Sequence, residues 1–228
     1  MSKKIMFNDK FDLTQAVLEG RKTMTRRIFY IPDKLAPYLD IDDTFDIVDN
    51  CIIWKDKSDN IRMTFEPKYK VGEVIAIAQS YMDVDNYYYA ALRRKTSIHG
   101  QIIDELDLVD IHDIIKWKSL RDDLMNTPGW TNKMFVKADL MPHHIKITGI
   151  KVERLQDISD EDCLKEGIIH AYTDNDGIKI YHTPHTKRGY LSTDIPQQAF
   201  EFLINKVSGK GIWESNPFVF AYEFVLFD

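Results

Sequence analysis

The sequence predicts a mixed α+β fold that is mainly β, built as a small β-barrel decorated with helices. Many short apolar or alternating segments are separated by turn residues, whereas only a few stretches have helical spacing. A length of 228 residues favours one elaborated domain over residues 1–228, because a chain of this size buries enough surface to need no disulfide or metal. Two polar stretches, at about 82–130 and 169–195, are expected to be insertions in that domain.

The composition argues against several classes of protein. With 36 acidic and 30 basic residues, the chain does not resemble a general nucleic-acid coat protein, although a local basic cleft is compatible with an acidic body. The two cysteines, Cys51 and Cys163, provide no disulfide framework, which indicates a reducing compartment. The sequence has no apolar leader and no apolar run of membrane-spanning length, so we expect a cytoplasmic protein without a membrane segment.

The first predicted elements are a short strand and a helix. The strand is KIMFN, residues 4–8, and Asp12 or Thr14 is expected to cap the helix that follows. The helix has Leu13, Ala16 and Val17 on its apolar face. It should end at Gly20, because glycine tolerates the left-handed backbone that ends many helices.

A hairpin, a buried strand and a helix are expected in the middle of the chain. Residues 44–54 and 60–67 alternate or run apolar, as the two strands of a hairpin with KDKSDN as its turn would. Residues 74–78 have the continuous apolar character of a buried strand. The polar stretch that follows is expected to be too short and too charged for a core of its own. One helix face in it is formed by Ile111, Ile114, Ile115, Trp117 and Leu120.

The C-terminal third predicts one strand, two helices and a final strand. The strand lies in HHIKITGIKVER, and Ser159 with Asp162 three residues later is a capping pattern for a short helix that Gly167 ends. A longer helix is expected to begin near Pro196. Its core face is Ala199, Phe200, Leu203, Ile204 and Val207. The last segment, 217–228, is apolar on both faces, which is typical of a central strand.

Cations and hydroxyls follow the first predicted helix without an acidic residue among them. They lie at residues 21–27 of the segment AVLEGRKTMTRRIF, residues 16–29. The negative end of a helix dipole attracts nearby cations by about 0.3–1 kcal/mol, which accounts for Arg21 and Lys22 without any function. It does not account for Thr23 and Thr25, whose hydroxyls beside a lysine offer nucleophilic or hydrogen-bonding chemistry.

Glu166 is a second candidate, because a carboxylate in the last turn of a helix faces the negative end of the dipole. The histidines of 143–144 and 182–185 lack the ligand spacing of a zinc site, so no metal is expected. Cys163 is expected to face the core as an inert thiol. No phosphate-binding or dinucleotide-binding glycine motif occurs, so no cofactor is expected.

Aromatic residues are dense between residues 81 and 130. Tyr81, Tyr87 to Tyr89, Trp117 and Trp130 would be suited to stacking against a nucleobase. Aromatic residues at this density are also typical of a hydrophobic core. From the sequence, both interpretations stay open.

Four blocks in one order resemble the ASCH family. They are EGRKTMTRR, YKVGEVIAI, VERLQDISDEDCLKEGI and WESNPFVFAYEF, and the likeness extends over roughly 3–30, 67–81, 141–168 and 196–227. The longer ASCH-like proteins of bacteriophage and prophage regions are the most similar. The resemblance implies a PUA-like β-pseudo-barrel with a cleft beside the first block, whereas the segments between the blocks have no counterpart in the minimal domain.

The resemblance also implies a function and a set of residues. ASCH domains are thought to bind RNA, and some small bacterial members are amidohydrolases that deacylate N4-acetylcytidine. Matching the family's motif residue by residue gives Lys22, Thr25 and Glu166 as the catalytic set. The neighbours expected to bind a nucleoside or single-stranded RNA are Arg21, Thr23, Arg26, Arg27 and Tyr81.

The implied chemistry makes a geometric demand. Lys22 would accept the proton of Thr25, and Glu166 would orient the lysine or protonate the leaving exocyclic amine. Backbone N–H groups or Arg26 would stabilise the oxyanion. A regular strand through residues 22–25 would place Lys22 and Thr25 on opposite faces, so a turn or twist is required there. Two alternatives stay open: a non-catalytic RNA-binding module, and a phage-encoded protein that contacts a protein partner through residues 82–130.

Overall fold

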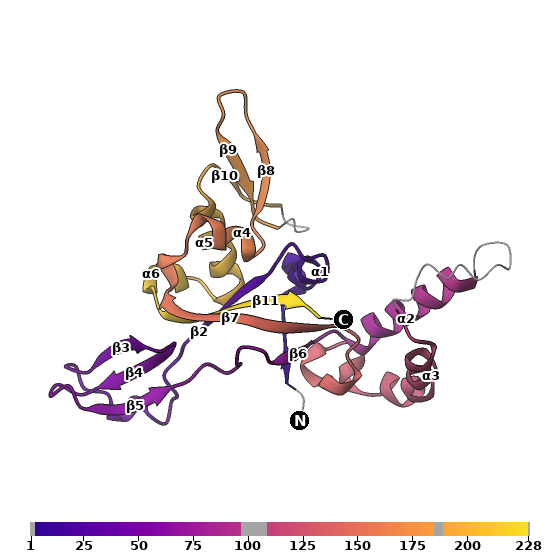
Figure 1. Ribbon diagram of the computed structural model, residues 1–228, viewed down its shortest axis with the longest axis horizontal. Helices are drawn as coiled ribbons and strands as arrows, with labels where there is room; N and C mark the ends of the chain where they lie inside the picture. Colours follow the sequence, from indigo (N-terminus) through magenta and orange to yellow (C-terminus); the bar gives the residue numbers. More distant parts are fainter. Residues whose placement is uncertain (1–2, 97–108, 185–188, 228) are drawn as a thin grey trace. The chain divides into compact units, whose positions relative to one another are not determined.

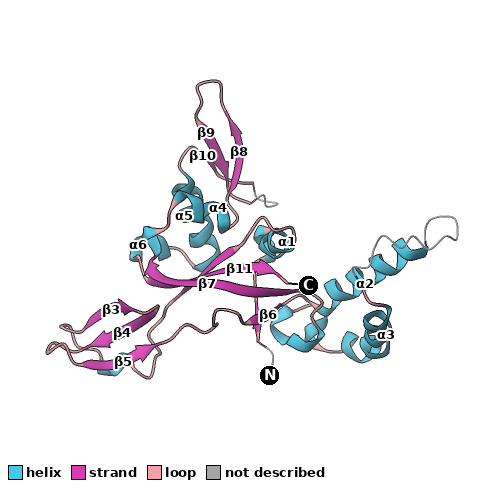
Figure 2. Ribbon diagram, viewed as in Figure 1, coloured by secondary structure: helices cyan, strands magenta, loops and turns pink. Residues whose placement is uncertain are grey.

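The structure of the protein is a computed structural model that describes residues 3–96, 109–184 and 189–227 (Figure 1). Strands and helices are mixed, with the strands in open sheets (Figure 2), which confirms the predicted α+β class. The chain divides into two compact units. The first combines residues 3–7 with the described part of 75–144, and the second combines 8–74 with the described part of 145–227. The single domain expected from the sequence stays a prediction.

The second unit is built around a long central strand. β11, Phe218–Leu226, pairs antiparallel with β2, Met24–Ile28, on one side and with β7, His144–Arg154, on the other. Most of β11 is buried, as its apolar sequence predicts. The register places Tyr222 opposite Thr25 and Ala221 opposite Arg26, so β11 fixes the orientation of the basic segment.

Four helices belong to the second unit. They are α1, Leu13–Leu18, α4, Asp160–Lys165, α5, Pro196–Ser208, and α6, Ile212–Ser215. The sequence signals mark the ends of the second and third, whereas Asp12 precedes the first without a side-chain cap and the last was not predicted. The Ser159 hydroxyl accepts a hydrogen bond from the backbone N–H of Asp162, and Pro196 occupies the first turn of α5, as predicted. Gly167 has φ 104°, which confirms the predicted glycine stop after α4.

The segment 44–54, predicted as one strand, is two strands. β3, Thr44–Val48, and β4, Cys51–Lys55, form a hairpin, and β5, Ile61–Phe65, pairs with β4 to complete a three-stranded sheet. Asp49 and Asn50 have φ 50° and 61°, the backbone that a tight two-residue hairpin turn requires and that Asp and Asn adopt more readily than most residues. The sequence analysis did not identify Asp49 and Asn50 as a two-residue turn.

The polar stretch 169–195 contains a second small sheet. β8, Ile169–Thr173, and β9, Lys179–His182, form a hairpin, and β10, Ser192–Thr193, pairs with the other side of β9. This agrees with the turn-rich hairpin that the sequence indicates. Residues 185–188, which include the last histidine of the HTPH motif, lie outside the described residues.

The first unit contains a parallel strand pair and two helices. β1, Lys4–Ile5, pairs with β6, Val74–Ile77, and the helices are α2, Tyr81–Thr96, and α3, Ile111–Met125. They contribute to a buried hydrophobic cluster of Ala76, Ala78, Tyr81, Val84, Trp117, Val136, Ala138 and Met141. Only Val84 and Trp117 of these buried residues lie within 82–130, so this stretch does not form the cluster alone.

The predicted apolar face of α3 is only partly correct. Ile114 and Trp117 are buried, whereas Ile111 and Ile115 are 45% and 60% exposed. Single 3-10 turns occur at Asp9–Phe11, Ala36–Tyr38, Pro128–Trp130, Lys133–Phe135, Ala138–Leu140 and Leu155–Asp157. Within the described ranges, no helix is both long and apolar enough to cross a bilayer.

Candidate functional site

Lys22 and Glu166 lie together inside the second unit. The Lys22 Nζ donates to the Glu166 Oε2 at 2.6 Å and to the Glu166 backbone oxygen at 2.7 Å. The two residues are 2% and 4% exposed. Gly167 allows this approach, because its backbone follows the end of α4 in a left-handed conformation directly beside the Lys22 side chain. The structure thus brings together two of the three residues that the family resemblance implies.

Arg26 belongs to the same buried cluster. Its Nη1 donates to Glu166 Oε1 at 3.1 Å and to the Met24 sulfur at 3.3 Å, and its Nη2 donates to Asp162 Oδ2 at 2.9 Å. Nε and Nη2 also donate to Glu153 Oε1, at 2.9 and 2.6 Å. A guanidinium has five N–H donors, and all are used. Arg26 can therefore bind a ligand only by giving up a carboxylate, which argues against its predicted role in RNA binding.

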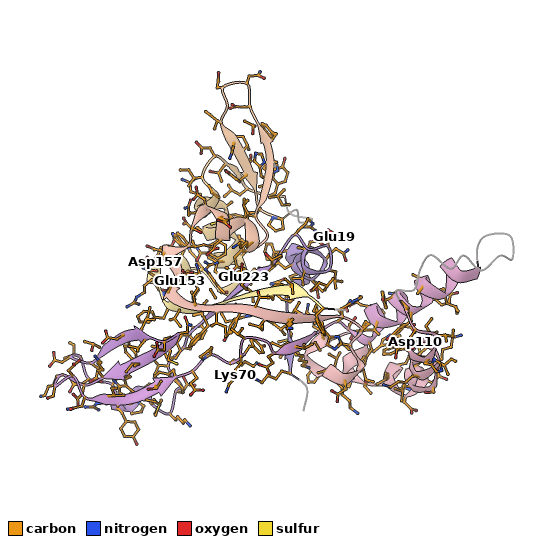
Figure 3. The ribbon with its side chains drawn as sticks, in the orientation of Figure 1. Glu19, Lys70, Asp110, Glu153, Asp157 and Glu223 are labelled. Carbon is orange, nitrogen blue, oxygen red and sulfur yellow. The ribbon has the colours of Figure 1, made fainter. Side chains whose placement is uncertain are left out.

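Lys151 completes a charge-balanced cluster. Its ammonium contacts Asp162 and, at 3.0 Å, Glu153 Oε2. Glu153, which is labelled in Figure 3, lies on β7, as does Lys151. The three cations, Lys22, Arg26 and Lys151, thus face the three carboxylates of Glu153, Asp162 and Glu166. Buried charges are tolerated only when they are paired and hydrogen-bonded, and this cluster meets that condition. The Lys151 side chain is 43% exposed, so the cluster reaches solvent at that residue. We name these six residues the buried charge cluster.

Burial sets the proton affinities in the cluster. It lowers the pKa of Lys22, against the opposing effect of Glu166, and the charges of Arg27 and Arg26 lower it further. Burial works to raise the pKa of Asp162, but hydrogen bonds from Lys151 and Arg26 hold it below the ordinary value. A buried lysine with a depressed pKa beside a carboxylate is suited to accept a proton.

Cys163 has the inert environment that the sequence predicts. It is fully buried, and burial raises the pKa of its thiol to about 12. The nucleophilic form of a cysteine is the thiolate. Cys163 therefore packs in the hydrophobic core and does not act as a nucleophile.

Thr25 and Arg27 point to the other face of β2 from Arg26, because side chains alternate along a strand. Thr25 is 5% exposed and lies opposite Tyr222. Among the described residues, its hydroxyl makes no hydrogen bond with Lys22 or Glu166. Burial lowers the pKa of Arg27, while nearby Tyr69, Glu166 and Tyr222 act in the opposite direction.

The geometric demand at residues 22–25 is met in part. β2 begins at Met24, so Lys22 and Thr23 precede the regular strand and strict alternation does not apply to them. The backbone N–H of Thr23 donates a hydrogen bond to the backbone oxygen of Lys165 at 2.9 Å. The structure therefore has the irregular backbone that the implied chemistry requires, without a direct contact between Lys22 and Thr25.

The remaining predicted residues make no contact within the charge cluster in the structure of their own unit. Arg21 is exposed and pairs with Glu19 at 2.6 Å and Asp12 at 3.2 Å. Tyr81 belongs to the first unit, where it is 2% exposed and its hydroxyl accepts from the Lys137 N–H. Its ring packs against Trp117 and offers no open face to a base, so the core interpretation of this tyrosine is confirmed.

Glu153, Asp162 and Lys151 were not predicted as site residues. Asp162 was assigned only a capping role, and Glu153 and Lys151 were read as ordinary strand residues. The one signal was the alternation of Lys151 and Glu153, which places both side chains on the same face of β7. Among the described residues, no group of three His, Cys, Asp or Glu side chains is arranged to hold a metal ion.

The chain was compared with known proteins in three ways. No protein-family model, no curated protein and no solved structure matches it.

Proposed function

We propose that the chain is an ASCH-like protein with a PUA-like pseudo-barrel, related to the longer phage and prophage members, and that it recognises a nucleobase or modified nucleoside beside Lys22, Thr25 and Glu166. The observation that supports the proposal is the buried contact of Lys22 with Glu166. These residues are 144 positions apart in the chain, and the blocks that contain them are the ones that resemble the family. The proposal places the protein in the cytoplasm.

The reaction we assign is hydrolysis of an N4-acylated cytidine. Neutral Lys22 takes the hydroxyl proton of Thr25 while the Thr25 oxygen bonds to the acyl carbonyl carbon. The bond from that carbon to the exocyclic nitrogen breaks, and the nitrogen receives the proton back from Lys22. Water then hydrolyses the threonine ester, which releases the carboxylic acid and restores the hydroxyl.

The electrostatics of the cluster support these roles. A lysine must be neutral to act as a base, and burial lowers the pKa of Lys22. Glu166 orients the amine, because its carboxylate and its backbone oxygen both accept from Nζ. Thr25 faces away from Arg26 in the structure, so the reaction requires the irregular backbone at residues 22–23 to move and bring Lys22 to the Thr25 hydroxyl when substrate binds. Catalytic hydrogen bonds commonly tighten only in the complex.

The test is release of cytidine from N4-acetylcytidine by the parent and by Lys22→Ala, Thr25→Ala and Glu166→Ala. Arg21→Ala is the matched control, since it removes an exposed cation from the same segment. We expect turnover in the parent and in Arg21→Ala, and a loss of at least about 100-fold in the other three, the scale of one acid–base or nucleophilic group. Parent turnover that survives all three changes would refute the assigned roles.

The second candidate is a non-catalytic nucleoside or RNA-binding module. The observation that favours it is the closure of the cluster, in which both Glu166 oxygens and all the Arg26 donors are already engaged. A closed cluster stabilises a fold without performing chemistry. Salt-sensitive retention of RNA that is lost in Arg27→Ala, together with no turnover, would favour this module over the hydrolase.

A further inference from the structure

We infer that Arg26 is a positioning residue that shares the Glu166 carboxylate with Lys22 and thereby lowers the proton affinity of the Lys22 amine. The effect on Lys22 follows from the geometry of the cluster alone. Its benefit for catalysis rests on the function proposed above, because a neutral amine is needed there. Arg26 was expected from the sequence to bind RNA, so this is a different role.

The geometry shows one carboxylate divided between two cations. Glu166 Oε2 accepts from Lys22 Nζ at 2.6 Å, and Oε1 accepts from Arg26 Nη1 at 3.1 Å. Glu166 therefore cannot compensate Lys22 in full. A nearby like charge disfavours the charged form of its neighbour, and Arg26 is such a charge, bound to the same carboxylate as Lys22.

Of the two cations, only Lys22 can give up its proton. A guanidinium stays protonated at any pH at which a protein is folded, whereas a buried ammonium loses its proton readily. The charged groups that act on Lys22 are Glu166 from the end of α4 and Arg26 and Arg27 from β2. The two arginines both oppose the positive charge of Lys22, and Glu166 supports it.

The surroundings fix Arg26 in this position. Glu153 on β7 and Asp162 on α4 accept from it, and the ring of Phe200 on α5 lies 5.9 Å from the guanidinium carbon. Because its side chain is fully buried and held from three elements, Arg26 cannot turn away from Glu166. The positive charge beside Lys22 is thus a fixed part of the fold.

The inference is tested by the titration of Lys22 itself. The protein is labelled with 13C at lysine Cε, the Lys22 signal is assigned by its loss in Lys22→Ala, and its chemical shift is followed with pH. In Arg26→Gln the titration midpoint of Lys22 should move to higher pH, because the Glu166 carboxylate then binds no cation of Arg26 and stabilises the Lys22 ammonium alone. Arg26→Lys keeps the charge and should stay near the parent, and exposed Arg21→Gln is the control that should not move.

The outcomes separate this role from a structural one. A loosened cluster would shift Arg26→Lys and Arg26→Gln alike toward the midpoint of an exposed lysine, and that result overturns the inference, as does an unchanged midpoint in Arg26→Gln. If Arg26→Gln does not fold, Glu153→Gln replaces it and should lower the midpoint, because an anion is lost; no shift or a rise overturns the inference. Absence of cytidine release with the predicted shifts intact would refute the hydrolase alone.

Discussion

Lys22 and Glu166 form a buried ion pair across 144 residues of sequence, with Nζ 2.6 Å from Oε2. One partner precedes β2 and the other ends α4, so the pair joins a strand and a helix of the second unit. Both charges are out of water, and the pair is completed by Arg26, which binds the second carboxylate oxygen.

Removing one partner of the pair should destabilise the fold strongly. Lys22→Met leaves Glu166 with one cation fewer in a buried site, and breaking a buried pair costs about 3–5 kcal/mol. Urea unfolding followed by circular dichroism measures the loss. Arg21→Ala breaks only exposed pairs and should cost no more than about 1 kcal/mol. Similar losses in both variants would contradict the buried pair.

The two partners should also couple. Because they share one interaction, Lys22→Met combined with Glu166→Leu should destabilise by clearly less than the sum of the two single changes. The same urea experiment gives the coupling free energy. Additive losses, within about 0.5 kcal/mol, would show that the two side chains do not interact.

Acid should weaken the fold through Asp162. Its pKa is below the ordinary value of 3.8 in the folded protein, so the carboxylate contributes stability that is complete above 3.8 and is lost as the pH falls through the lower folded value. Asp162→Asn should therefore flatten the dependence of the unfolding free energy on pH in this acid range. Parent and variant curves that stay parallel there would rule out this role for Asp162.

Cys163 should be unreactive in the folded protein. With a pKa of about 12 and no exposure, its thiol has neither the charge nor the access to react. The other cysteine, Cys51, is only half-buried. Labelling with iodoacetamide at neutral pH should be absent from Cys51→Ser and should appear when that variant is unfolded in urea. Labelling of folded Cys51→Ser at the rate of a free thiol would contradict the packing.

Gly129 should tolerate no side chain, because of Tyr81. A Cβ on Gly129 would lie 2.5 Å from Tyr81 Cε2, so Gly129→Ala must displace a buried ring. Overpacking of this kind costs about 1–3 kcal/mol, measured by thermal unfolding of the whole chain. Tyr81→Leu should rescue Gly129→Ala by removing the clash. A harmless Gly129→Ala would show that Tyr81 is free to move, and would reopen its predicted contact with a base.

Local signals in the sequence predicted the elements whose causes are local. Ser159, Gly167 and Pro196 mark helix ends because each acts through its own backbone neighbourhood, and the apolar run of β11 reflects burial on both faces. The tight turn at Asp49 and Asn50 also has a local cause, but strand-like residues flank it on both sides, so the whole segment resembled one strand.

The charge cluster could be predicted only in part. The family resemblance linked Lys22 with Glu166, yet no local pattern links Arg26 to Glu153 or Asp162, which are 127 and 136 residues away. Such contacts depend on which faces of β2, β7 and α4 meet, and a single sequence does not encode this in any periodicity. For the same reason Arg26 was assigned to a ligand when its partners are carboxylates of its own chain.

The measurement that tests the central claim most directly compares two changes at Thr25. Thr25→Val keeps the shape of the side chain and removes the hydroxyl, whereas Thr25→Ser keeps the hydroxyl and removes a methyl group. With both variants folded, we predict that Thr25→Ser releases cytidine from N4-acetylcytidine and that Thr25→Val does not. Release by Thr25→Val at the parent rate would contradict the proposed chemistry of Lys22, Thr25 and Glu166.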